Sequence, residues 1–206
     1  AGRTPRQRQQ GKFLIMGSIT EIARPEIREL VPYSAASYAE GLVRLNANET
    51  PWPAPGDKAG SGLNRYPPEK ATLLTERLAD YYGVAPPQLL VTRGSSEAID
   101  LIIRSFCRPG KDAVVVCPPT FGMYRVYADV QGARVHEVPL RADQGFALDA
   151  DELARNWPDD GKVLFICSPN NPTGNRFDTA EILLLATLLS GKALVVVDAA
   201  YAEFGT

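Results

Sequence analysis

Residues 162–201 read KVLFICSPNNPTGNRFDTAEILLLATLLSGKALVVVDAAY, and this stretch decides the fold. Two short and mostly apolar runs, at 162–167 and 193–197, have the length and the β-branched content of buried strands. The segment between them predicts a helix, which Asp178 opens as a capping residue and which ends before Gly191, where a left-handed cap is wanted. A strand, a helix and a second strand in this order are typical of a parallel sheet.

The same alternation extends back to residue 88. Arg108-Pro109-Gly110 ends one of the earlier helices, because proline and glycine break a helical pattern. The chain is therefore expected to form an α/β fold, with a largely parallel sheet and helices on both faces. The further expected strands are 88–92, 113–117 and 134–138, and the further expected helices are 69–82 (burying Leu74, Leu78 and Tyr81), 95–107, 121–131 and 149–156.

The composition excludes several classes of function. The 206 residues are 45% hydrophobic, carry a net charge of −2, and contain three cysteines and one histidine, His136. This balance gives no general attraction to nucleic acid or to an anionic membrane, and no apolar run approaches the roughly 20 residues of a spanning helix. The cysteine pattern indicates neither a metal site nor a disulfide framework, and a cytoplasmic protein fits best. Residues 1–15, basic at their start, are interpreted as a leader or vector-derived segment.

Several residues with chemical potential follow expected strand ends. Asp198 comes directly after the run 193–197, and a carboxylate at the mouth of a buried strand needs a cationic partner. A protonated pyridine nitrogen would be such a partner. Tyr201 and Asn171 could both donate to an oxygen on the same ring. Taken alone, each also has an ordinary explanation: a cap for the next turn, a core tyrosine, and a turn former.

Two further strand ends add to this pattern. Ser95 and Ser96 open a helix, where free amides and the helix dipole can hold a phosphate, although capping by serine explains them equally well. Phe121 could stack on a planar ring, although alone it is better explained as a core residue. Four successive expected strand ends are thus followed by groups that could bind one ligand: serines for a phosphate, an aromatic ring for stacking, an amide donor, and an Asp/Tyr pair. Their conjunction predicts a pyridoxal 5′-phosphate (PLP) site.

The residues resemble those of the histidinol-phosphate aminotransferase family of fold-type-I PLP enzymes, over about residues 20–206. The matching segments are LNANE at 45–49, LNRYP at 63–67, RGSSE at 93–97, CPPTFGMY at 117–124, SPNNPTG at 168–174 and DAAYAEF at 198–204. The resemblance implies a homodimer. Residues 16–60 would be an N-terminal arm and part of a small domain, and 61–206 the first part of the PLP-binding large domain.

The resemblance also implies a role for each site residue. Phe121 replaces the commoner tyrosine and Ala199 the commoner glutamate, and neither change removes a required function, because stacking needs only a ring face. The implied roles are the cofactor phosphate for Ser95 and Ser96, the ring face for Phe121, the ring oxygen for Asn171 and Tyr201, the ring nitrogen for Asp198, the partner subunit's cofactor phosphate for Tyr66, and the substrate phosphate for Tyr33.

A transaminase also needs a lysine, which binds the cofactor as a Schiff base and moves the substrate proton. None of the six lysines is suitable, because each lies before an expected strand, in or near the Pro/Gly-rich connection, or in the leader. We therefore expect the chain to be the amino-terminal part of a longer enzyme and to be inactive alone. The six are Lys12, Lys58, Lys70, Lys111, Lys162 and Lys192.

The function that this pattern favours is transamination between histidinol phosphate and a 2-oxo acid, in histidine biosynthesis. A different PLP enzyme of the same fold is an alternative, such as an aromatic-amino-acid aminotransferase or a threonine-phosphate decarboxylase. A non-catalytic PLP-binding domain, as in a PLP-responsive regulator, is the alternative from another class. No DNA-binding helix pair or basic domain supports that alternative.

Overall fold

The computed structural model describes residues 18–33, 41, 43, 45–57, 62–66 and 72–204. The chain divides into two units: unit 1 consists of residues 1–29 and 94–206, and unit 2 consists of residues 30–93.

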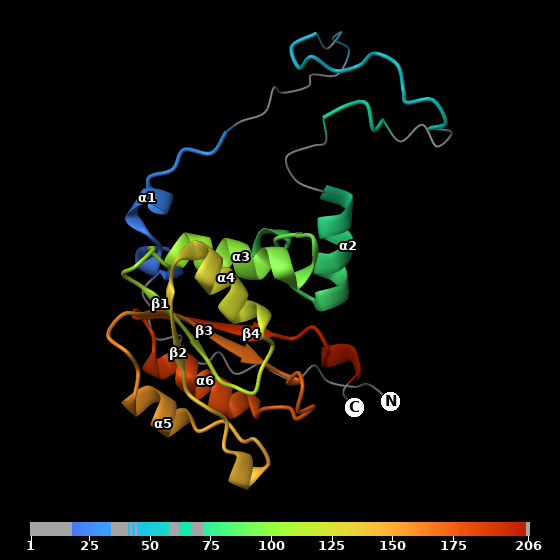
Figure 1. Cartoon of the computed structure of the whole chain (residues 1–206). Coiled ribbons are helices and arrows are strands. Elements are labelled where there is room, and N and C mark those ends of the chain that lie inside the picture. Colours follow the sequence, from blue (N-terminus) through green and yellow to red (C-terminus); the bar gives the residue numbers. More distant parts are fainter. Residues whose placement is uncertain are drawn as a thin grey trace, which may run out of the picture. The chain divides into compact units, whose positions relative to one another are not determined.

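Unit 1 is built around a four-stranded sheet, whose strands are β1 (Ala113–Val116), β2 (Arg134–Glu137), β3 (Gly161–Cys167) and β4 (Leu194–Asp198). The strand order is β2-β1-β3-β4, and every neighbouring pair is parallel (Figure 1). The central β1 is buried along its whole length, as expected for a continuous apolar run covered on both faces. The predicted α/β fold with a parallel sheet is confirmed.

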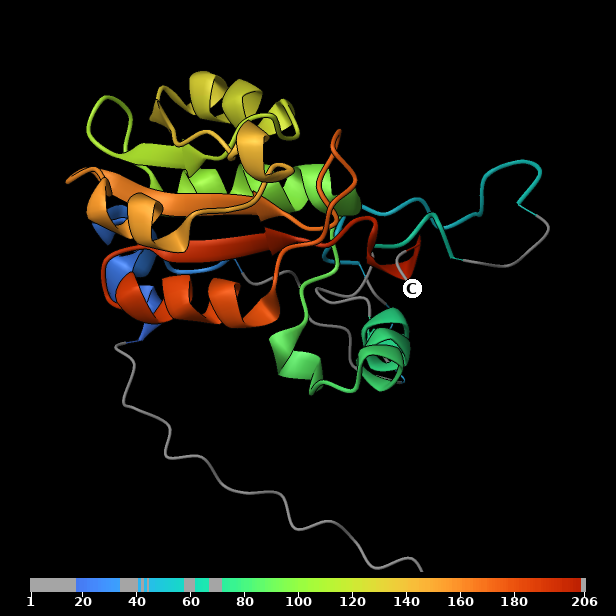
Figure 2. The same cartoon turned by 90° about the horizontal axis from the view of Figure 1, so that it is seen from below.

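Helices cover both faces of this sheet. One face carries α3 (Gly94–Phe106) and α4 (Met123–Gln131), and the other carries α5 (Ala150–Arg155) and α6 (Thr179–Leu188) (Figures 1 and 2). All four were expected from the sequence to within a few residues. The short elements of unit 1 are η1 (Ile19–Ile22), α1 (Pro25–Arg28), η3 (Ala142–Gln144) and η4 (Ala202–Phe204).

The core consists of two clusters, one on each face of the sheet. Successive side chains of a strand point to opposite faces, so Leu164 and Ile166 of β3 enter one cluster while Phe165 enters the other. On the first face they meet residues such as Leu185 of α6, and on the second face Phe165 meets residues such as Ile103 of α3. Burial of these apolar chains is the main force that holds helices to the sheet.

Local signals set the helix ends. The Asp149 carboxylate accepts a hydrogen bond from the Glu152 amide (2.8 Å) and so caps α5, and Asp178 caps α6 by accepting from the Ala180 amide (2.9 Å). Helix α4 ends at Gly132, whose φ of 72° is the left-handed conformation that glycine adopts without strain.

Unit 2 contains α2 (Thr72–Tyr82) and η2 (Pro86–Gln88). Two expectations fail here. No strand forms at 88–92, because apolar residues become a strand only when another strand pairs with them, and none does so among the described residues. Helix α2 buries Ala79, whereas Leu74 is exposed and Tyr81 is 71% exposed.

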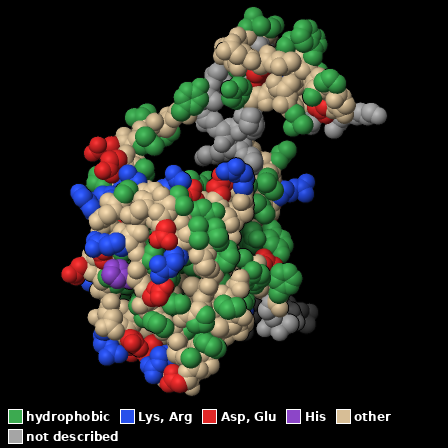
Figure 3. Space-filling view, viewed as in Figure 1, with side chains coloured by type: hydrophobic (Ala, Val, Ile, Leu, Met, Phe, Trp, Pro, Cys, Tyr) green, Lys and Arg blue, Asp and Glu red, His purple; other side chains and the backbone are tan. Residues whose placement is uncertain are grey.

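The surface of unit 1 mixes charges of both signs. Figure 3 shows Lys and Arg side chains interspersed with those of Asp and Glu on the face in view, with the histidine among them. Within the described residues, no helix combines the length and the apolar character that crossing a bilayer requires.

Candidate active site

The carboxyl edge of the sheet gathers most of the predicted site residues. Strands β1, β3 and β4 are parallel neighbours, so their carboxyl ends lie at the same edge. Cys167 at the end of β3 is in register with Asp198 at the end of β4, and the Ser168 amide donates to the Asp198 carbonyl oxygen (2.9 Å). The loops that follow β1 and β3 therefore leave the sheet beside Asp198.

Asp198 has a hydrogen-bond donor on each carboxylate oxygen. The Tyr124 hydroxyl donates to Oδ2 (2.8 Å), and the Ala200 amide donates to Oδ1 (3.1 Å). The carboxylate is half-buried, so it keeps acceptor capacity toward the open edge of the sheet. This arrangement orients a negative charge where a ligand cation could meet it.

An aromatic cluster supports that carboxylate. The Tyr124 ring stacks on Phe165 of β3, with centroids 4.7 Å apart and planes at 8°, and meets Phe121 edge-on at 5.5 Å and 83°. Tyr124 is 0% exposed. Burial, and then the hydrogen bond to Asp198, raise the pKa of Tyr124 well above its ordinary value, so the phenol keeps its proton. Phe121 itself is half-buried and lies just before α4.

Asn171 and Tyr201 meet at the same edge. The Asn171 Nδ2 atom lies 3.5 Å from the Tyr201 hydroxyl, at the limit of a hydrogen bond. Asn171 is half-buried, and Tyr201 is 44% exposed. Two polar groups that approach each other at the mouth of adjacent strands can share one acceptor on a ligand.

Asn170, which the sequence analysis did not single out, ties two loops of the site together. It is 4% exposed, and its Nδ2 donates to the Pro119 carbonyl (2.9 Å) and to Thr173 Oγ1 (2.6 Å). Its Oδ1 accepts from Thr120 Oγ1 (3.2 Å). The loop after β3, which carries Asn171, is thus fixed to the loop after β1.

Ser95 and Ser96 lie in the first turn of α3, after Gly94, whose φ is 73°. Helix α3 runs against the strands: Cys107, just after its last turn, contacts the Ala113 carbonyl at the start of β1 (Sγ–O 3.9 Å). Its first turn therefore points toward the carboxyl edge (Figure 1). The predicted strand before this helix does not form. The chain enters the first turn of α3 from an irregular segment that ends at Gly94.

The two remaining predicted residues, Tyr33 and Tyr66, belong to unit 2. Tyr33 is 88% exposed and Tyr66 is 61% exposed. The Tyr66 amide donates to Glu49 Oε1 (2.6 Å), and Glu49 pairs with Arg65 (3.1 Å). This local network fixes the backbone at Tyr66 and leaves its side chain available.

The lysines that the structure describes lie at the opposite edge. Lys111 precedes β1, Lys162 is the second residue of β3, and Lys192 precedes β4, so all three are at the amino ends of strands. Lys12, Lys58 and Lys70 fall outside the described residues.

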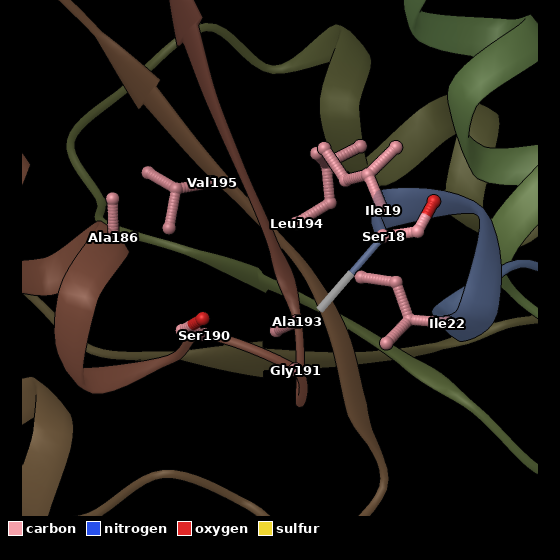
Figure 4. A pocket seen from close by; sticks show the side chains of 9 residues that line it. All are labelled: Ser18, Ile19, Ile22, Ala186, Ser190, Gly191, Ala193, Leu194 and Val195. Carbon is pink, nitrogen blue, oxygen red and sulfur yellow. The ribbon is translucent and has the colours of Figure 1, made fainter. Parts of the chain in front are cut away.

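A small hollow also lies at the amino end of β4, away from the predicted site. Its volume is about 120 Å³, and Figure 4 shows the residues that line it, among them Ile19 and Ile22 of η1 and Leu194 of β4. Its lining is mainly apolar, which is typical of a packing gap under a short helical segment rather than of a catalytic pocket. No group of three potential metal ligands occurs in the part of the chain that the structure describes.

A parallel sheet with polar groups gathered at its carboxyl edge is the usual setting of a ligand site in α/β proteins. The model of the aminotransferase class I and II family matches residues 42–206, and the chain belongs to this family. Histidinol-phosphate aminotransferase from Pectobacterium atrosepticum is 46% identical over 191 residues, which cover 92% of this chain and 53% of that protein. The Stenotrophomonas maltophilia enzyme of the same name is 46% identical over 194 residues, covering 90% and 52%. The chain thus spans about half the length of these relatives.

Solved structures agree on the fold. N-succinyldiaminopimelate aminotransferase from Mycobacterium tuberculosis matches with a TM-score of 0.60 and 32% identity, covering 68% of this chain and 39% of that one. Aspartate aminotransferase from Thermus thermophilus matches with a TM-score of 0.56 and 29% identity, covering 60% and 34%.

Proposed function

We propose that this chain supplies the cofactor-binding half of a PLP-dependent aminotransferase that transfers an amino group between histidinol phosphate and a 2-oxo acid. The observation that carries the proposal is the Asp198 carboxylate, held by Tyr124 and by the Ala200 amide at the carboxyl edge of the sheet. Membership of the aminotransferase class I and II family supports the reaction type. The similarity to histidinol-phosphate aminotransferases supports the substrate.

The groups at this edge fit the chemistry of PLP. A carboxylate with an oriented charge suits a protonated ring nitrogen, and an amide beside a phenol suits the ring oxygen. An aromatic side chain suits the ring face, and the first turn of a 13-residue helix suits the phosphate. In this assignment Asp198 binds the nitrogen, Asn171 and Tyr201 the oxygen, Phe121 the ring face, and Ser95 and Ser96 the phosphate.

Bound PLP supplies an electron sink for the negative charge that develops on the substrate carbon. The chain's own residues prepare that sink. Asp198 stabilises the proton on the ring nitrogen by charge pairing, while Asn171 and Tyr201 hold the ring oxygen in place. Phe121 covers one face of the ring and keeps water from it.

Two parts of the site come from elsewhere in this proposal. We place the lysine that carries the cofactor and moves the proton outside these 206 residues, because the described lysines, Lys111, Lys162 and Lys192, lie at the amino ends of strands and the chain spans about half the length of its relatives. The second subunit of a cytoplasmic homodimer contributes Tyr66 to the cofactor phosphate and Tyr33 to the substrate phosphate.

The test uses the full-length protein that contains this chain. The protein is incubated with PLP and reduced with borohydride, and its peptides are mapped by mass spectrometry. We expect one cofactor adduct, on a lysine outside these 206 residues; an adduct confined to one of the six lysines of this chain would refute the assignment. Turnover with histidinol phosphate and 2-oxoglutarate should exceed turnover with phenylalanine, and no carbon dioxide should form from threonine phosphate.

A further inference from the structure

We propose that Tyr124 is a positioning residue for Asp198: its hydroxyl holds the carboxylate in the orientation that pairs with the cofactor's ring nitrogen. The inference rests on the proposed PLP site and adds to it a residue that itself touches neither cofactor nor substrate. Tyr124 donates to Asp198 Oδ2 at 2.8 Å, from a helix 74 positions away in the sequence.

The core determines where the Tyr124 hydroxyl lies. Its ring is 0% exposed and stacks on Phe165 with centroids 4.7 Å apart and planes at 8°. The Phe121 ring meets it edge-on at 5.5 Å and 83°. A close-packed ring that is held on two sides has little freedom to tilt, so the hydroxyl is a fixed point against which Asp198 is oriented.

The direction of this hydrogen bond is also determined. Burial of the phenol, followed by its hydrogen bond to Asp198, raises the pKa of Tyr124, so the phenol stays protonated and donates throughout the neutral range. The Ala200 amide donates to the other oxygen of Asp198 (3.1 Å). Rotation of the carboxylate about its Cβ–Cγ bond would therefore strain or break two hydrogen bonds together.

Tyr124 also couples two contacts that the cofactor would make. Phe121, assigned to the ring face, rests its edge against Tyr124, and Asp198, assigned to the ring nitrogen, accepts the Tyr124 hydroxyl. Because one rigid side chain supports both, the charge and the stacking surface keep a constant relation to each other. Pre-organisation of this kind lets binding energy go into the pairing itself rather than into ordering the site.

The experiment compares two ligands in the full-length protein. One is PLP, and the other is its carbocyclic analogue, in which a C–H group replaces the ring nitrogen. Tyr124→Phe removes the hydroxyl and keeps the ring stack, and water can reach the half-buried Asp198 in its place. We expect this change to weaken PLP about tenfold, ~1.4 kcal/mol, and to leave the affinity of the analogue within about twofold. Binding is measured by absorbance and fluorescence titration, with circular dichroism to verify folding.

Two further variants serve as controls. Tyr127→Phe removes a hydroxyl from the same helix, where the ring packs against the same core cluster, and should change neither affinity. Asp198→Asn should remove the preference for PLP over the analogue, and adding Tyr124→Phe to it should have no further effect on that preference.

The outcomes separate this inference from the proposed function. If the unmodified protein binds neither ligand, the PLP assignment itself fails, and this inference with it. If it binds PLP and Tyr124→Phe leaves the preference unchanged, the PLP site stands and the role of Tyr124 is wrong. Equal weakening of both ligands by Tyr124→Phe would likewise overturn the inference, since it would show that the hydroxyl only supports the fold.

Discussion

Two adjacent asparagines should have opposite roles, and their exchange for alanine is the sharpest local test of the site. The Asn170 side chain makes three hydrogen bonds, with the Pro119 carbonyl, Thr173 and Thr120, and the residue is 4% exposed. The Asn171 side chain has one hydrogen-bond contact, at 3.5 Å, and the residue is half-buried. We expect the first residue to stabilise the site loops and the second to bind the cofactor.

The hydrogen bonds set the magnitude. At about 1 kcal/mol net for each bond, Asn170→Ala should lower the free energy of unfolding by about 3 kcal/mol. That value corresponds to an unfolding equilibrium shifted roughly a hundredfold. Asn171→Ala should cost about 0.5 kcal/mol or less, because its single contact is long and water can replace it. It should instead weaken PLP binding about tenfold, through loss of the donor to the ring oxygen.

The assay is urea unfolding of the cofactor-free full-length protein, followed by tryptophan fluorescence, together with PLP titration of each variant. The two substitutions remove the same atoms from neighbouring positions, so each is the matched control for the other. If Asn170→Ala destabilises the protein no more than Asn171→Ala does, the description of the site loops is wrong. If Asn171→Ala leaves PLP affinity unchanged, its assignment to the ring oxygen is wrong.

Three more results are expected. Asp198→Asn should weaken PLP by about 3 kcal/mol, roughly a hundredfold, because it removes one charge of a partly buried pair; a titration that shows less than a threefold loss, or about 0.7 kcal/mol, would contradict this. Phe121→Leu should weaken PLP about fivefold in the same titration whereas Phe121→Tyr should not, since stacking needs only a ring face. Burial raises the pKa of Cys107 and of Cys117 from 9.0 to about 12, so the folded state keeps these protons to a higher pH than the unfolded state does. The contribution of these thiols to the free energy of unfolding should therefore be constant below about pH 8 and should decrease by about 1.4 kcal/mol per thiol by pH 10. Urea unfolding at pH 8 and pH 10 should show that Cys107→Ala and Cys117→Ala each lose about 1.4 kcal/mol of this decrease.

The parts of the fold that could be predicted from sequence are those with local causes. The helix at α6 follows from Asp178, which caps its first turn, and from the apolar residues that pack it on the sheet. The predicted strand at 88–92 failed because a strand depends on a partner elsewhere in the chain, which local composition does not report.

The same distinction holds in the site. The position of Asp198 at the carboxyl end of β4 was predictable, because the sequence places a carboxylate directly after an apolar run. Tyr124 and Asn170 were missed because their roles depend on partners 74 and 50 positions away, Asp198 and Thr120. One signal was present: Tyr124 belongs to the matching segment CPPTFGMY at 117–124, three residues after Phe121.

The central claim is that Asp198 pairs with the ring nitrogen of PLP at the carboxyl edge of the sheet. The most direct measurement is the ¹⁵N NMR shift of PLP labelled at that nitrogen and bound to the full-length protein, with and without Asp198→Asn. We predict the shift of a protonated pyridine in the unmodified protein and a change toward the unprotonated value in the variant, under identical buffer conditions. The same shift in both proteins would contradict the account.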